Sequence, residues 1–178
     1  SPTKTHRHES FPEYKANRKK MEDDFKQQIP ITWKMIADMN LPSLVVPGYE
    51  ADDIISTLVR TYKSEPELVI DVYSSDKDLK QLLDRNVFCV DPMKNIRVDT
   101  KQFLQEFLFE PALMLDYLAL LGDSSDNIPG VAGIGPKKAS DLIKQYGSLD
   151  NIYAHLDDLP PDLKQNLTEH RQIAYILI

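Results

Sequence analysis

The sequence predicts an α/β fold, in which a mostly parallel sheet flanked by helices is followed by a helical subdomain without strands. The first observation is that short β-prone runs alternate with segments of helical periodicity up to residue 121, a pattern typical of parallel sheets. The second is a cluster of glycine and proline between residues 122 and 136. The third is that only helical periodicity follows this cluster. We therefore predict two domains, residues 1–121 and 122–178.

Strands are expected where short apolar runs meet turn residues. Leu44-Val45-Val46 is predicted to be a buried strand that Pro47-Gly48 ends, and residues 68–73 and 87–90 are predicted to be the next two strands. Cys89 lies on the last of these and is expected to be a core residue.

Helical spacing predicts the other elements. Phe25, Ile29 and Trp33 recur every four residues, so a helix is expected over residues 22–39, kinked or split at Pro30. Two later helices begin at threonine or proline, which favour a first turn. We also expect an extended start over residues 1–10 and helices over 13–20, 52–62, 77–83, 100–107, 111–121, 136–146, 148–155 and 161–169.

Composition excludes several classes of protein. Of the 178 residues, 42% are hydrophobic and 28% charged, so the chain is neither disordered nor fibrous. A single cysteine excludes a disulfide framework and fits a reducing compartment, so we expect a cytoplasmic protein. No apolar run approaches the roughly 18 residues that a membrane span needs. Because the chain starts without Met and stops inside an apolar stretch, we expect it to be a piece of a longer chain.

Charge is unevenly distributed along the chain, whose net charge is -7. Six basic residues against two acids give residues 1–20 a charge of +4, and nine acids against four basic residues give residues 48–84 a charge of -5. Residues 130–147 carry +2, from three lysines and one aspartate. Basic ends around an acidic middle fit a polyanion held on both sides of a metal site, although any single charged run is more often a solvated face.

Three groups of carboxylates follow predicted elements closely: Glu50, Asp52 and Asp53; Asp76 and Asp78; Asp123 and Asp126. In an open parallel sheet, sites form at the carboxyl ends of the strands, so the first two groups should converge there. Seven carboxylates in one cleft repel one another unless cations neutralise them, and Mg²⁺ or Mn²⁺ prefers oxygen ligands. Two such ions about 4 Å apart can activate a water and stabilise the leaving oxygen of a phosphodiester.

Each group also has a purely structural interpretation. Asp52 and Asp53 can stabilise a helix dipole. Asp76 can be an N-cap, and Asp123 and Asp126 can cap a turn. Taken one at a time, these interpretations are as good as metal binding for the first group and better than metal binding for the other two, but the three groups together favour a metal site.

A helix-hairpin-helix is predicted by the run Gly130-Val131-Ala132-Gly133-Ile134-Gly135-Pro136-Lys137-Lys138-Ala139, which we call the glycine hairpin. Gly133 and Gly135 permit positive φ and a close backbone approach, and the proline suits the first helical position. The next helix would present free N–H groups with Lys137 and Lys138 beside them, which binds phosphate without reading sequence. The alternative is a plain turn between helices.

Lys15 and Arg18 stand three residues apart and would share one face of a helix. Two cations there could stabilise charge developing on a phosphate, although surface pairs with this spacing are common. His6 and His8 flank Arg7 but have no third metal ligand, so we expect both to be solvated.

Together these motifs make the chain resemble the 5′→3′ exonuclease and flap endonuclease family, most closely the exonuclease domain at the N-terminus of bacterial DNA polymerase I. The resemblance spans nearly the whole chain and implies a PIN-like fold and a bacterial, nucleoid-associated protein. The matching stretches, in family order, are residues 4–9 (KTHRHE), 12–18 (PEYKANR), 48–53 (GYEADD), 75–78 (SDKD), 122–130 (GDSSDNIPG) and the glycine hairpin.

The resemblance implies a role for each candidate residue. The implied ligands of a first divalent metal are Glu50, Asp52 and Asp53, and those of a second are mainly Asp76, Asp78, Asp123 and Asp126. Lys15 and Arg18 would lie in a helical arch over the scissile phosphate and act in catalysis. The implied DNA contacts are Arg7, Gly133, Gly135, Lys137 and Lys138.

The implied substrate is duplex DNA with a 5′ flap, gap or nick, cut by a monomer with two Mg²⁺ or Mn²⁺ ions, while hairpin carbonyls hold a K⁺. The family also carries two aspartates and an apolar strand upstream of the stretch matched by residues 4–9. We therefore expect an incomplete first metal site and a chain that is weakly active or inactive. Two alternatives stay open: a DNA-binding module without catalysis, which has no need of seven acids, and a PIN-like ribonuclease, against which the hairpin argues.

Overall fold

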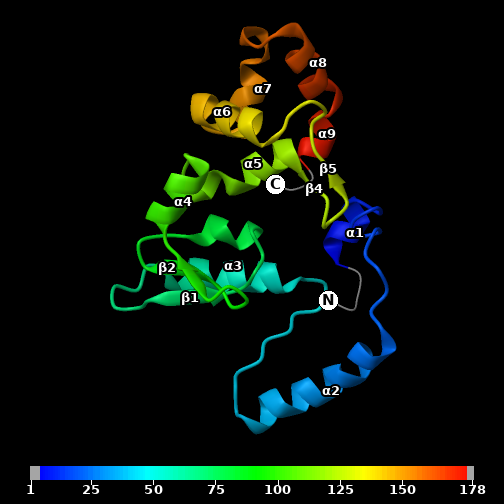
Figure 1. Ribbon diagram of the computed structural model, residues 1–178, viewed down its shortest axis with the longest axis vertical. Helices are drawn as coiled ribbons and strands as arrows, with labels where there is room; N and C mark the ends of the chain where they lie inside the picture. Colours follow the sequence, from blue (N-terminus) through cyan, green and yellow to red (C-terminus); the bar gives the residue numbers. More distant parts are fainter. Residues whose placement is uncertain (1–4, 176–178) are drawn as a thin grey trace.

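The computed structural model describes residues 5–175, and Figure 1 shows a small sheet below a group of helices. The sheet has three strands in the order β1 (Ile70–Tyr73), β2 (Val87–Asp91) and β3 (Ile96–Val98). β1 and β2 run parallel, with Val72 opposite Cys89, and β3 is antiparallel to β2. The α/β class, the two parallel strands and the burial of Cys89 are confirmed. β3 is an addition, because three residues are too few to show an alternating pattern.

Most predicted helices form with small shifts at their ends. α2 passes through Pro30 without a break, so the predicted split does not occur; the proline removes one backbone hydrogen bond and the neighbouring turns keep theirs. The helix predicted over residues 77–83 is a 3₁₀ helix, η1 (Asp78–Leu82), and another 3₁₀ turn (Pro111–Leu113) precedes α5. The helices are α2 (Asp23–Asp38), α3 (Ala51–Tyr62), α4 (Thr100–Phe107), α5 (Met114–Leu121), α6 (Pro136–Tyr146), α7 (Leu149–Ala154), α8 (Pro161–Glu169) and α9 (Arg171–Ala174).

The strand predicted over residues 44–46 does not form. Leu44 and Val45 are 58% and 69% exposed, and the segment is an extended link between α2 and α3. No strand within residues 5–175 pairs with it. A strand needs a neighbour that satisfies its backbone N–H and C=O groups, so the apolar run alone is not sufficient.

The N-terminal segment differs from the prediction in two places. Instead of an extended start, α1 (His6–Ser10) begins after Thr5, whose hydroxyl lies 3.1 Å from His8 Nδ1, so His8 takes part in a cap and is not simply solvated. Instead of a helix over 13–20, turns follow α1, and Lys15 has a left-handed φ of 57° that no α-helix accepts. The Lys15 backbone N–H donates to the Asp126 carbonyl at 2.9 Å, so a distant segment holds this conformation.

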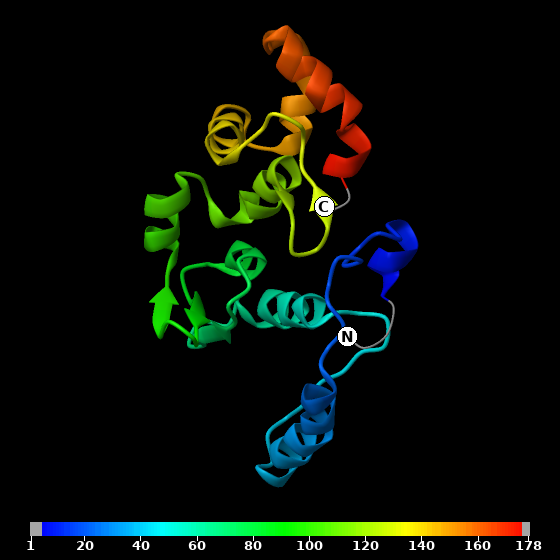
Figure 2. The ribbon, with the colours of Figure 1, turned by 45° about the vertical axis from the view of Figure 1, so that its right-hand side comes forward.

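Two apolar clusters form the core. Figure 2 shows α6–α9 gathered at one end and α2 standing apart at the other. Fully burying one large apolar side chain contributes about 1.5–3 kcal/mol, so the larger cluster supplies most of the stability. The smaller cluster joins α3 to the sheet through Val59, Val72, Leu79 and Val87. The larger cluster contains Phe103, Leu118, Leu120, Ile143, Leu149, Ile152 and Leu167, among others.

A two-residue hairpin, β4 (Gly122–Asp123) and β5 (Ile128–Pro129), follows α5, although no strand is predicted beyond residue 121. The backbone of Gly122 lies so close to that of Gly130 that a Cβ on Gly122 would stand 2.2 Å from the backbone nitrogen of Gly130. Only glycine fits there. The turn between the two strands carries Asp126 towards the N-terminal segment.

The larger cluster unites side chains from both sides of residue 121, so α4 and α5 pack with the helical group. The domain boundary at 121/122 stays a prediction. No helix among the described residues has the length and apolar character to cross a bilayer. The expected extended start over residues 1–4 and the apolar end over residues 176–178 lie outside the described residues.

Candidate active site

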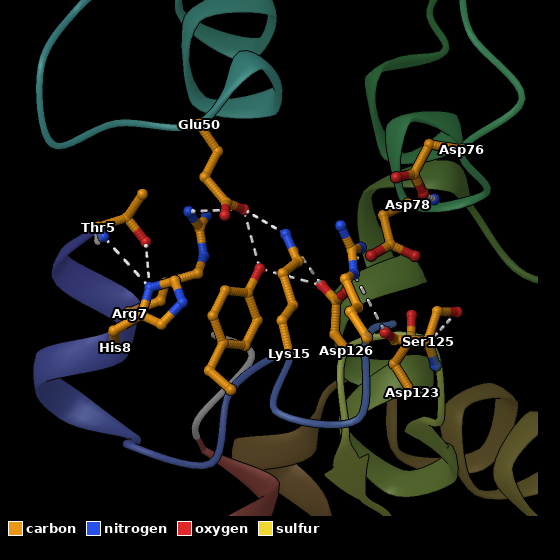
Figure 3. A network of polar contacts seen from close by, with 12 residues as sticks. Thr5, Arg7, His8, Lys15, Glu50, Asp76, Asp78, Asp123, Ser125 and Asp126 are labelled. Atoms are coloured by element: carbon orange, nitrogen blue, oxygen red, sulfur yellow. Dashed lines mark hydrogen bonds and ion pairs between the residues drawn. The ribbon is translucent and has the colours of Figure 1, made fainter. Parts of the chain in front are cut away.

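A cleft of about 370 Å³ is bounded by α1, the turns after it, the start of α3, η1 and the β4–β5 turn. Figure 3 shows Glu50 and Asp126 directed at Lys15 from opposite sides, with Asp78 and Asp123 further along. A neighbouring cleft shares Asp78 and Asp126 with the first one and adds Arg18, Asp76 and Asp123. The three predicted carboxylate groups are therefore brought together. The acids that line the first cleft are Glu50, Asp52, Asp53, Asp78 and Asp126.

Glu50 is the buried centre of the first cleft, with 7% of its surface exposed. Its Oε2 accepts hydrogen bonds from Lys15 Nζ at 2.7 Å and from the Tyr14 hydroxyl at 2.8 Å. Burial by itself would raise the pKa of this carboxyl, but the hydrogen bonds from Lys15 and Tyr14 hold the pKa below its usual range. Glu50 is therefore ionised and neutralised by its neighbours.

Tyr14 connects Glu50 to Asp126, which lies far away in the sequence. Its buried hydroxyl also lies 3.0 Å from Asp126 Oδ2, and burial followed by the bond to Glu50 raises the pKa of Tyr14. Asp126 Oδ1 accepts from Arg18 at 2.8 Å, and Lys15 Nζ stands 3.7 Å from Asp126 Oδ2. Lys15 and Arg18 thus meet at one carboxylate although they share no helix.

Arg7 and Asp53 form a two-point ion pair at 2.9 and 2.7 Å. Asp53 Oδ2 also accepts from the Glu50 backbone N–H at 2.8 Å, so Asp53 takes part in the capping box of α3, a contact that the helix-dipole interpretation did not include. The hydrogen bond from Arg7 lowers the pKa of Asp53. Arg7 and Asp53 therefore neutralise each other in this structure. The predicted contact of Arg7 with DNA remains a prediction.

Asp123 and Asp76 each accept hydrogen bonds through one carboxylate oxygen from a residue two positions further along the chain. Asp123 Oδ1 accepts from the backbone N–H and the hydroxyl of Ser125 at 2.8 and 2.7 Å, while Oδ2 lies 3.2 Å from Lys77 Nζ. Asp76 Oδ1 accepts from the Asp78 backbone N–H at 3.1 Å. The capping interpretation therefore holds for Asp123, whereas the predicted N-cap role of Asp76 is wrong, because Lys77 is the N-cap of η1 and Asp76 lies one residue before it.

Asp78 is the least compensated acid of the site. Its Oδ1 is buried and has no hydrogen-bond partner among the described residues. Burial, then the charges of Asp76 and Asp123, raise the pKa of Asp78 to about 7. Burial, then Asp76, likewise raise the pKa of Asp52. Negative charge thus exceeds positive charge on this side of the cleft.

The carboxylates are oxygen donors of the type that Mg²⁺ and Mn²⁺ prefer, and the orphaned Asp78 oxygen fits a cation better than it fits a closed ion-pair network. No group of three or more His, Cys, Asp or Glu side chains within residues 5–175 stands in a ready-made metal-binding arrangement. Lys15, Arg18 and Lys77 occupy the carboxylate oxygens instead.

The glycine hairpin forms much as its sequence predicts. Val131 and Ile134 are buried, Gly133 has a φ of 75°, and α6 begins at Pro136. Gly135 is the exception: it is the extended N-cap of α6 and has no positive φ. Lys138 Nζ donates to the Gly133 carbonyl at 3.1 Å, and no described carboxylate pairs with Lys137 or Lys138.

Tyr14 and Lys77 are site residues that the sequence reasoning passed over. Both lie inside stretches that carry the family resemblance, PEYKANR and SDKD, and that position is the signal that could have found them. Their partners are 36 or more residues away in the sequence, so no local spacing reveals the contacts.

The fold and site define an α/β protein with a carboxylate-lined cleft and a helical extension, which consists of α6–α9. Residues 1–108 match the family model described as the 5′-3′ exonuclease N-terminal resolvase-like domain, and residues 109–177 match the 5′-3′ exonuclease C-terminal SAM fold. The chain belongs to the 5′-3′ exonuclease family, which confirms the resemblance seen in the sequence.

Curated relatives support this assignment. The chain is 36% identical to a 5′-3′ exonuclease of Aquifex aeolicus over its whole length, and it spans 61% of that relative. It is 39% identical to a DNA polymerase I of Pseudomonas aeruginosa, with 97% of the chain and 20% of the relative covered. The chain thus spans about three fifths of the free-standing exonucleases that it matches.

Solved structures share the fold. A bacteriophage T5 flap endonuclease, in a complex with DNA and metal ions, superposes with a TM-score of 0.82 at 24% identity, covering 98% of this chain and 68% of that one. The catalytic core of Rad2 in complex with a DNA substrate gives a TM-score of 0.55 at 16% identity, covering 89% and 56%.

Proposed function

We propose that this chain carries the active site of a metal-dependent 5′→3′ exonuclease and flap endonuclease that hydrolyses DNA phosphodiester bonds. The observation that carries the proposal is the convergence of seven carboxylates and Arg18 at two adjoining clefts, with Lys15 paired to Glu50. The curated relatives of this chain include 5′-3′ exonucleases and DNA polymerases I. The structure of the similar T5 flap endonuclease contains DNA and metal ions.

Two divalent cations, Mg²⁺ or Mn²⁺, are the proposed cofactors. Two cations bound among these acids would supply charge neutralisation and activation of a water for attack on phosphorus. The proposed ligands of the first are Glu50, Asp52 and Asp53, and those of the second are Asp76, Asp78, Asp123 and Asp126. Asp78 is the best placed of them, because its buried oxygen lacks any described partner.

Lys15 and Arg18 bind the scissile phosphate in this proposal. At present the Lys15 ammonium and the Arg18 guanidinium neutralise Glu50 and Asp126. Both cations are freed for the phosphate when those carboxylates receive other positive partners, and they then stabilise the charge that develops during hydrolysis. Tyr14 holds Glu50 and Asp126 in place through its hydroxyl.

The proposed substrate is duplex DNA with a 5′ flap, gap or nick, bound by a cytoplasmic monomer. The start of α6 contributes free backbone N–H groups beside Lys137 and Lys138, which suits phosphate contacts that are independent of base sequence. The Gly133 carbonyl already accepts from an ammonium group at 3.1 Å, which supports a K⁺ at the hairpin.

A DNA-binding module without catalysis is the second candidate. The observation in its favour is that lysine and arginine side chains already neutralise several carboxylates. This candidate predicts binding of a flap substrate without cleavage.

A single-turnover assay on a 5′-flap duplex separates the two candidates. We expect cleavage near the flap junction with Mg²⁺ and none with EDTA. We also expect Asp126→Asn to weaken Mn²⁺ binding, because a neutral oxygen replaces a charged one, whereas an aspartate that only caps a turn would tolerate asparagine. Binding without cleavage, with equal Mn²⁺ affinity in parent and variant, would establish the non-catalytic module.

A further inference from the structure

A second groove begins where the active-site cleft ends. Ser56 and Gln81 line both the cleft and this groove, so the two spaces adjoin. The groove has a volume of about 610 Å³ and reaches from the C-terminal half of α3 to the start of α4. We call it the α3 groove. None of the seven acids assigned to the active site lines it.

The α3 groove is basic although the chain as a whole is acidic. Two acids, Asp84 and Glu110, also line it, so four cations against two acids leave +2 in a chain of net charge -7. Asp84 pairs with Lys63 at 2.9 Å, whereas no carboxylate in the described part of the chain pairs with the three other cations. The four cations that line the groove are Arg60, Lys63, Arg85 and Lys101.

Thr100 adds a neutral donor to this surface. It is the first residue of α4 and lines the groove, and its hydroxyl oxygen is buried without a partner among the described residues. The hydroxyl has no capping role, because Asp99 already caps α4 by accepting from the Gln102 backbone N–H at 2.8 Å. An orphaned hydroxyl beside unpaired cations suits an anionic oxygen.

The spacing on α3 gives the groove a direction. Asp53, Ser56, Arg60 and Lys63 follow one another at intervals of three, four and three residues, so they share one face of the helix. At about 1.5 Å per residue, this row extends roughly 15 Å from the active-site end. One strand of B-form DNA carries about four phosphates over that length.

We propose that the α3 groove binds the phosphate backbone of a nucleic-acid strand that continues from the active-site cleft. The inference rests on the proposed nuclease function and adds a substrate contact separate from the glycine hairpin. No aromatic side chain lines the groove, so bases have no stacking platform and binding is independent of base sequence.

The test compares a groove variant, Arg60→Gln with Lys101→Gln, with the parent chain in EDTA, where no cleavage occurs. The probes are a blunt fluorescent duplex and the same duplex with a ten-nucleotide 5′ arm. Removing one cation from a phosphate reduces the slope of log K against log salt by about 0.7–0.9, so we expect the slope to fall by about 1.4–1.8. A reduction confined to the armed probe assigns the groove to single-stranded backbone, and an equal reduction on both probes assigns it to duplex.

A matched control variant is Lys94→Gln with Lys164→Gln, which removes the same charge from exposed lysines outside the groove. We expect its slope to equal that of the parent. Arg60→Lys with Lys101→Arg should keep the parent slope, which shows that charge and not local packing is measured.

Three results would overturn the inference. If the parent binds the probes and the groove variant has the parent slope, the groove does not contact the backbone, and the proposed nuclease function is untouched. If instead the groove variant loses only binding to poly-glutamate, the groove fits an acidic protein segment. A parent chain that binds neither probe would contradict the proposed function and this inference together.

Discussion

The carboxylate clefts and the helical extension are held together by different forces. Around Glu50 and Asp126, chain segments meet through ion pairs and hydrogen bonds, with Tyr14 and Lys15 between them. In the helical extension, fully buried side chains such as Leu149 interlock without charge. Ion pairs can exchange one partner for another, whereas close-packed apolar side chains cannot. The comparison indicates that the clefts are built to rearrange and the extension is built to stay rigid.

Leu149→Ala should produce the largest loss of stability, because it leaves a cavity in the rigid part. We expect the free energy of unfolding to fall by about 2–5 kcal/mol, measured by urea denaturation. Leu44→Ala, at an exposed position, is the matched control and should change little. Equal effects of the two substitutions would contradict the assignment of the core.

Lys15→Ala tests the exchangeable part. We expect single-turnover cleavage of a 5′ flap to slow by about 100- to 1,000-fold, because a group that stabilises developing charge is removed. Lys94→Ala serves as a control, because Lys94 pairs with none of the seven acids of the site. Among the described residues it pairs only with Asp91. Cleavage of Lys15→Ala at the parent rate would show that Lys15 only neutralises Glu50.

Asp78→Asn should stabilise the metal-free protein at pH 8 by about 1–3 kcal/mol, because it removes a buried negative charge that lies near Asp76 and Asp123. The folded pKa of Asp78, about 7, lies above its ordinary value of 3.8. The charged form therefore opposes folding, and the penalty grows from about pH 4 to pH 7 and is constant above. The gain measured by urea denaturation in EDTA should be larger at pH 8 than at pH 5.

The exposed Asp158→Asn is the control for that experiment and, as a surface substitution, should change the stability by about 0.5 kcal/mol or less. The same Asp78→Asn variant should bind Mn²⁺ more weakly than the parent. A variant that is less stable than the parent at pH 8 would show that Asp78 has a favourable partner after all.

Lys137→Ala with Lys138→Ala should have the smallest effect, confined to DNA binding. The slope of log K against log salt should fall by about 0.9 for each phosphate that the variant no longer binds, equally for all sequences. Stability should change by about 0.5 kcal/mol or less, because the variant loses only one exposed hydrogen bond, from Lys138 to the Gly133 carbonyl. An unchanged slope would remove the hairpin from the DNA-binding surface.

Local signals in the sequence were sufficient for α6, α7 and α8, although the short α9 was not predicted. α6 begins at the predicted proline and ends before Gly147, which adopts the left-handed conformation that a glycine tolerates. The same local reasoning was wrong at residues 13–20 and 44–46. In the first case a bond to the Asp126 carbonyl holds Lys15 out of a helix, and in the second a strand lacks a neighbour among the described residues.

The sequence by itself determined the family, most of the helices and the position of the glycine hairpin, because each motif, the helical period and the turn residues depend on residues close together in the chain. It also named the seven acids and the two cations of the candidate site. Only the tertiary structure decided which of them touch. Tyr14 joins Glu50 to Asp126, and Lys77 pairs with Asp123. One Asp78 oxygen has no hydrogen-bond partner among the described residues. All three features depend on segments that lie far apart in the sequence. Side chains so separated in sequence are brought together only by the folded chain, and no spacing along the sequence encodes the distance between them.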